Sequence, residues 1–141
     1  MKRLFILLAL LTSSLFTFAQ TNRNKVNLSD KEIVNFLWGF AQAHPDGFTI
    51  GIDTFDQPKE GIVVSYAATQ NSFDKKSLPA VIKHAREHEG FVGGWYNPEN
   101  KKYYFDSNRI FPEDSLAAAV KFARENGQHT VYICSKDINV K

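Results

Sequence analysis

The segments SLPAVIKHARE at residues 77–87 and SLAAAVKFARE at residues 115–125 read as copies of one another. They lie 38 residues apart and are identical at seven of eleven positions. The correspondence continues upstream, where Phe73 aligns with Phe111. Such a repeat indicates a duplicated supersecondary unit. It therefore predicts an architecture, although it does not predict an activity.

The start of the chain has the features of a secretory signal. Lys2 and Arg3 precede an apolar run over residues 4–11, and a small-residue exit ends at Ala19. The run is much shorter than the ~20 apolar residues that span a bilayer. We therefore expect a cleaved signal peptide over residues 1–19 and an exported protein, periplasmic or extracellular, without a membrane span.

The charge balance argues against a nucleic-acid partner. The full sequence has 17 lysine and arginine residues and 15 aspartate and glutamate residues. Loss of Lys2 and Arg3 with the signal makes the mature chain formally neutral. A protein that follows nucleic-acid phosphates needs a basic face. Cys134 is the only cysteine, so no internal disulfide is expected.

An amphipathic helix is predicted over residues 30–43. Ser29 and Glu32 have the spacing of a capping box at its start. Its apolar periodicity stops before Pro45, which disfavours helical geometry in the preceding residue. A strand is expected over residues 48–54.

The duplicated region predicts the central fold. Strands are expected over residues 61–67, 91–96, 102–107 and 131–134, and helices over residues 77–90 and 112–127. Two strand-helix-strand halves with right-handed crossovers predict a ferredoxin-like βαββαβ plait, an α+β fold with both helices on one face. Residues 62–64 are consecutive and apolar, so we expect the N-terminal helix and its extra strand to cover the second face.

These elements define the expected domain organisation. A signal peptide over residues 1–19 and a linker over residues 20–28 precede a single α+β domain over residues 29–135. The duplicated halves occupy residues 61–135, and residues 136–141 form a C-terminal tail.

A ligand site is predicted where two loops meet. We expect the strands over residues 61–67 and 102–107 to lie side by side and parallel, so that the loops leaving them share one edge. The candidate ligand-binding residues are Tyr66, Gln70, Asn71, Ser72, Asp106, Ser107, Asn108 and Arg109. Their donors and two helix starts suit a carboxylate or another anion. The alternative is that these residues cap helices and close turns.

A second motif suggests metal chemistry. His84, Glu87 and His88 have the form H-x-x-E-H, the zinc-binding helix pattern of inverzincin peptidases. The alternative is a structural role, because His84 aligns with Phe122 in the other copy, beside the apolar stripe of its helix. We expect no catalytic residues and no cofactor, and we treat a metal site as the less favoured interpretation.

Two resemblances accompany these patterns. Residues 47–133 resemble a small module of unassigned function in bacteriophage and mobile-element proteins. The turns and strands that carry this resemblance lie at residues 47–50, 58, 61–66, 93–95, 103–107 and 123–128. The doubled halves are also similar in layout to SPOR domains, which bind peptidoglycan glycan strands. Ser72 and Ile110 stand where SPOR domains have glycine before Phe73 and Phe111.

The sequence thus favours an exported, non-enzymatic binding module whose partner is an envelope polymer or protein. One alternative is a small exported metal-dependent hydrolase or effector that uses the H-x-x-E-H segment. Another alternative is an inhibitor or immunity-type protein.

Overall fold

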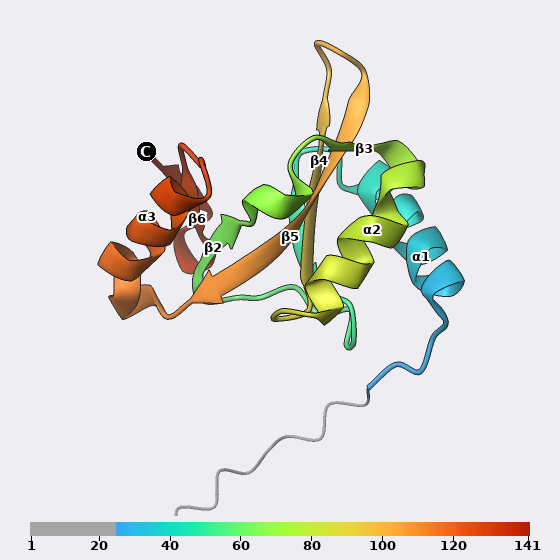
Figure 1. Ribbon diagram of the computed structural model, residues 1–141, viewed down its shortest axis with the longest axis horizontal. Helices are drawn as coiled ribbons and strands as arrows, with labels where there is room; N and C mark the ends of the chain where they lie inside the picture. Colours follow the sequence, from blue (N-terminus) through green and yellow to red (C-terminus); the bar gives the residue numbers. More distant parts are fainter. Residues whose placement is uncertain (1–24) are drawn as a thin grey trace, which may run out of the picture.

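A computed structural model describes residues 25–141 as an α+β fold (Figure 1). The helices are α1 (Asp30–Ala43), α2 (Asp74–Arg86) and α3 (Leu116–Glu125). The strands are β1 (Phe48–Gly51), β2 (Ile62–Ser65), β3 (Ser72–Phe73), β4 (Phe91–Asn97), β5 (Lys102–Phe111), β6 (Val131–Ile133) and β7 (Ile138–Val140). The expected signal peptide lies outside the described residues. No helix among those described is long and apolar enough to cross a membrane.

The strands form one antiparallel sheet in the order β1-β4-β5-β2-β6-β7, and β3 pairs separately with β5. The long strand β5 connects the two parts of this sheet. Its first part pairs with β4 and its last part pairs with β2. Asn108 lies at the junction, opposite Phe91 of β4 on one side and Ser65 of β2 on the other.

The expectation that the first and third strands of the duplicated region are parallel is wrong. They correspond to β2 and β5, which pair antiparallel. A crossover through α2 makes β2 and β4 run in the same direction, and the hairpin after β4 then reverses the chain. Residues 106–109 also form no loop, because they lie inside β5.

The helices cover one face of the sheet. Leu37 of α1 and Leu78 of α2 share a core cluster with Phe105 of β5. Ala119 of α3 packs in a second cluster with Phe111 of the same strand. Because alternate residues of a strand share a face, Phe105 and Phe111 point to the same side. Figure 1 shows α1 and α2 beside each other near β4 and β5, whereas α3 lies near β2 and β6.

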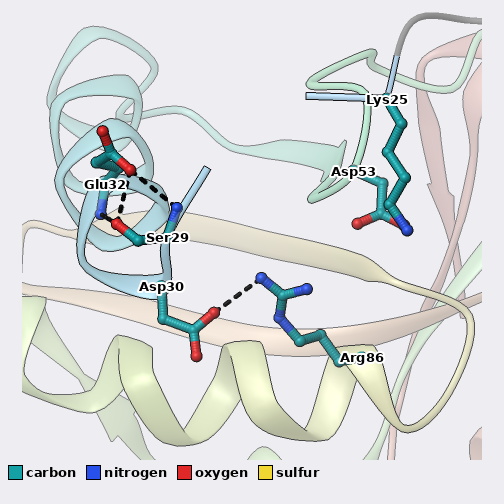
Figure 2. Close-up of polar contacts among 6 residues, drawn as sticks. All are labelled: Lys25, Ser29, Asp30, Glu32, Asp53 and Arg86. Atoms are coloured by element: carbon teal, nitrogen blue, oxygen red, sulfur yellow. Dashed lines mark hydrogen bonds and ion pairs between the residues drawn. The ribbon is translucent and has the colours of Figure 1, made fainter. Parts of the chain in front are cut away.

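The helix α1 therefore does not cover the second face, contrary to expectation. It packs beside α2, and Arg86 Nη2 lies 2.8 Å from Asp30 Oδ1 (Figure 2). The predicted capping box at its start is present, because Glu32 accepts hydrogen bonds from the backbone and the hydroxyl of Ser29. An amphipathic stripe indicates that a helix buries one side, but it does not indicate against which face of a sheet.

The sheet extends beyond the duplicated region at both edges. The expected extra strand is present as β1, but it pairs with β4 at the edge of the sheet and does not cover the second face, contrary to expectation. Ile138–Val140 forms β7 beside β6, so part of the segment expected to be a tail belongs to the sheet. Val63 of β2, only 7% exposed, has Ile110 and Tyr132 as its cross-strand neighbours.

Candidate functional site

Antiparallel pairing brings the two predicted site segments side by side. Tyr66 donates its backbone N–H to the carbonyl of Ser107 at 2.9 Å. Ser107 in turn donates its N–H to Thr69 Oγ1 at 2.9 Å. Ser72 lies opposite Phe105 where β3 pairs with β5. The segments thus meet along β5 and not at two loops that share a sheet edge.

Strand alternation divides the predicted residues between two faces. Ser107 and Arg109 lie on the same side of β5 as Phe105, which faces the helices. Asp106 and Asn108 lie on the opposite side. The eight candidate residues therefore do not form one site.

On the helix-covered face, a group that we call the Tyr66 cluster joins α2 to α3. It comprises Tyr66, His84, His88, Glu89, Arg109 and Phe122. The Tyr66 hydroxyl donates to Glu89 Oε2 at 2.8 Å, and Arg109 Nε lies 3.5 Å from Glu89 Oε1. Burial, followed by the Glu89 carboxylate, raises the pKa of Tyr66 to about 12. The charged groups of this cluster are thus paired with one another.

The H-x-x-E-H segment lies at the end of α2. The His84 and His88 rings are stacked, with centroids 3.9 Å apart and planes 12° apart, and Glu87 caps the helix. Burial, and then His88, lower the pKa of His84. Parallel rings do not direct their nitrogen lone pairs at one point. Within residues 25–141, no group of three or more histidine, cysteine, aspartate or glutamate residues is arranged to hold a metal ion.

The remaining candidates stabilise the loop before β3. Gln70 Nε2 donates to the carbonyl of Asn126 at 3.3 Å, and Ser72 Oγ donates to the carbonyl of Thr69 at 2.7 Å. Asn71 has a left-handed φ of 59°, which asparagine tolerates better than most residues. These contacts agree with the turn-closing alternative.

The face opposite the helices carries a second set of side chains, which we call the open face. The strand registers place them in three rows: Trp95, Tyr104 and Phe73; Thr49, Gly93 and Asp106; Phe91, Asn108 and Ser65. In the part of the chain that the structure describes, neither helix-containing core cluster includes any of these residues. The open face is therefore the sheet surface available for contacts.

The first row is an aromatic platform. Trp95 is 42% exposed, and its ring stacks on Tyr104 with centroids 4.9 Å apart. Phe73 meets Tyr104 edge to face at 4.7 Å, and Lys102 Nζ lies 4.7 Å from the centroid of the Phe73 ring. Asn100 Nδ2 donates to the Tyr104 hydroxyl at 2.5 Å. These contacts fix the rings while leaving the indole accessible.

Asn108 is held against the backbone of β4. It is 3% exposed, and its Oδ1 accepts a hydrogen bond from Ser65 Oγ at 3.0 Å. A Cβ atom at Gly93 would collide with the Asn108 amide. Glycine is thus required in this strand because the amide approaches the backbone closely.

Asp106 lies between the aromatic platform and Asn108, and it is half-buried. Among residues 25–141, its carboxylate makes no hydrogen bond and no ion pair. Burial raises the pKa of Asp106 from 3.8 to about 6. Trp95 is its diagonal neighbour on β4, because Trp95 pairs with Tyr104 and Gly93 pairs with Asp106. A partly desolvated acid and an exposed aromatic ring thus occupy diagonal positions on one face of the sheet.

Sequence reasoning missed the contribution of Trp95. It placed this residue in the strand over residues 91–96, but it did not use the short turn before the strand over residues 102–107 to work out the register in which the two strands pair. A hairpin around that turn pairs Trp95 with Tyr104 and puts Asp106 on the same face by alternation. The register of the hairpin, and not a sequence motif, therefore indicated that Trp95 and Asp106 share a face.

Comparison with known protein families, curated proteins and solved structures finds no match for this chain.

Proposed function

We propose that this protein is an exported, non-enzymatic binding module built around a ferredoxin-like plait, and that it binds its partner with the open face. The observation that supports this function is the pairing of an unpartnered Asp106 carboxylate with the exposed Trp95 ring. Two of the residues selected from the sequence, Asp106 and Asn108, belong to this surface. Tyr66 and Arg109 then have structural roles on the other face.

The electrostatics of Asp106 favour a binding role. A charge removed from water without a partner costs free energy. Here burial alone accounts for the raised pKa of Asp106. A ligand that pairs with the carboxylate would recover that cost on binding. Strongly shifted groups of this kind concentrate at functional sites.

The aromatic platform supplies the apolar part of such a contact. Tryptophan and tyrosine are enriched at the energetic centres of interfaces. Because Trp95 is already stacked on Tyr104, little side-chain freedom is lost when a partner covers it. Figure 1 shows that the tip of the β4–β5 hairpin projects beyond the helices. Trp95 and Tyr104 pair below this tip, on the strands that lead to it.

The partner that we propose is a polymer or a protein of the cell envelope. The signal-like start of the chain supports this assignment, because an exported module meets envelope components after its translocation. The formally neutral mature chain is compatible with either type of partner.

Retention of the exported protein on purified sacculi and on immobilised envelope proteins tests this function. We expect retention by at least one of these, and we expect Trp95→Ala to abolish it. Leu116→Ala is the matched control, because Leu116 is similarly exposed, at 40%, but lies on α3. Equal retention of both variants, or no retention of the parent protein, would refute the proposal.

A further inference from the structure

We propose that the open face binds an arginine side chain of a polypeptide partner, with the guanidinium stacked on Trp95 and hydrogen-bonded to the carboxylate of Asp106. This inference rests on the proposed function and specifies the chemistry of its ligand. It follows from the placement of the two residues, from the charge of Asp106 and from a similar contact elsewhere in the protein.

The register places both groups within reach of one side chain. Trp95 and Asp106 are diagonal neighbours on paired strands, so their Cα atoms are about 7–8 Å apart and their side chains rise from the same face. One side of the indole stacks on Tyr104, whereas the residue as a whole remains 42% exposed. A planar group can therefore lie on the other side of the ring and still contact the neighbouring carboxylate.

The charge of the site favours a cation. Within residues 25–141, the Asp106 carboxylate has neither an ion-pair partner nor a hydrogen-bond donor. A guanidinium stacks on aromatic faces and also bonds carboxylates through two parallel N–H groups. Lysine is a compact, strongly hydrated charge, and its ammonium group cannot bond a carboxylate through two parallel N–H groups. Arginine therefore satisfies both groups of the site with one side chain.

The protein already contains this arrangement on its other face. The Arg109 guanidinium carbon lies 5.1 Å from the Phe122 ring centroid, while Arg109 Nε lies 3.5 Å from Glu89 Oε1. An arginine there combines an aromatic ring with a carboxylate. The open face presents the ring and the carboxylate without the arginine, so the missing component would come from a partner.

A carbohydrate fits this surface less well. Recognition of a sugar requires several placed polar side chains, carboxylates and amides among them, in addition to a stacking ring. On the open face, the amide of Asn108 is already bonded to Ser65 and is almost completely buried. Small ligands in general favour concave sites that bury most of their surface. A projecting hairpin with one exposed ring is better suited to the surface of another protein.

The test is an NMR titration of the purified exported protein with three synthetic peptides of otherwise identical sequence. The probe carries two arginines, and its controls carry citrulline, the uncharged isostere, or lysine. We expect the arginine peptide to shift the Trp95 indole N–H resonance. Replacement by citrulline should weaken binding by about tenfold or more, since a charge-assisted hydrogen bond is lost. Lysine should give an intermediate affinity.

Variants assign the effect to the site. Asp106→Asn should weaken binding of the arginine peptide as much as citrulline does, and Trp95→Ala should remove it. Asp114→Asn makes the same change of charge at an exposed position before α3 and should leave binding unchanged. Equal affinity for the arginine and citrulline peptides, or an unaffected Asp106→Asn variant, would overturn the arginine assignment.

The outcomes also separate this inference from the proposed function. If a soluble N-acetylglucosamine tetramer shifts the Trp95 resonance and the arginine peptide does not, the open face is a binding surface but its ligand is a glycan. If retention on envelope material depends on Trp95 but the arginine peptide does not bind, the function stands and the arginine assignment fails. If neither retention nor any titration depends on Trp95, both proposals fail.

Discussion

Asp106→Asn should make the free protein more stable. The substitution keeps the shape of the side chain and removes the charge that burial disfavours. The carboxylate has a pKa of about 6 in the folded protein against a reference value of 3.8. At 1.36 kcal/mol for each pKa unit, the ionised form costs about 3 kcal/mol at neutral pH. A buried amide without partners has a cost of its own, so we expect a net gain of about 1–3 kcal/mol.

The gain should depend on pH with a defined sign. The folded-state pKa of Asp106 lies above its unfolded value, so between about pH 4 and pH 6 the folded protein binds more protons than the unfolded chain. The free energy of unfolding of the parent protein therefore loses this contribution as the pH rises through that window. The difference between Asp106→Asn and the parent should be near its minimum at pH 4 and at its full size above about pH 6.5.

Urea denaturation of both proteins at pH 4, 5.5 and 7.5 measures this difference directly. Contributions from other titrating groups cancel, because the two proteins differ only at residue 106. The reasoning would be refuted if Asp106→Asn were less stable at pH 7.5, or if its gain were the same at all three pH values. Either result would mean that the carboxylate is solvated or has a partner in the folded protein.

Three other substitutions test separate parts of the structure. His84→Gln should remove an acid-induced loss of stability. Burial lowers the pKa of His84 below 6.5, so the unfolded chain takes up the proton first as the pH falls. Urea denaturation at pH 7.5 and 5.5 measures this loss, and an unchanged dependence of stability on pH would contradict the prediction. Gly93→Ala should lower the melting temperature, at a cost of about 1–3 kcal/mol, because its Cβ atom would displace the amide of Asn108. Ser29→Ala should cost about 1 kcal/mol through loss of the cap in Figure 2, measured by urea denaturation, and a neutral effect would count against the capping box.

The helices and their order were predictable because their signals are local. The two helices have apolar stripes at helical spacing, and each is followed by a glycine with a left-handed φ, Gly90 at 77° shortly after α2 and Gly127 at 65° shortly after α3. The capping box located the start of α1. Each of these signals depends on residues a few positions apart, so no knowledge of the tertiary structure was needed.

The direction of β5 relative to β2 could also be predicted from the order of the elements, although we expected these two strands to be parallel. A crossover preserves the strand direction and a hairpin reverses it, so the strand after residues 97–100 must run against β2. The length of β5 was harder to predict. Asp106 and Asn108 have low β-propensity and suggested a loop, but pairing with β4 keeps residues 106–108 extended, and Asn108 pairs with β2 as well.

The composition of the site depended on long-range geometry. The sequence selected Asp106 and Asn108, but it grouped them with Arg109, which points to the other face. It also placed α1 over the face that the structure leaves without a helix. The apolar stripe of an amphipathic helix is the same whichever face it covers, so the exposure of Trp95 could not be derived from local patterns.

The position of β5 has a consequence for the duplicated halves themselves. By sequence, β5 belongs to the second half, yet its first part hydrogen-bonds to β4 of the first half and its Phe105 fills that half's core. The two copies are thus interlocked and do not sit next to each other as independent units. A fragment cut in the turn at residues 98–101 would leave each piece with an unsatisfied strand edge. Expressed together, such fragments should reassociate, whereas either one alone should aggregate.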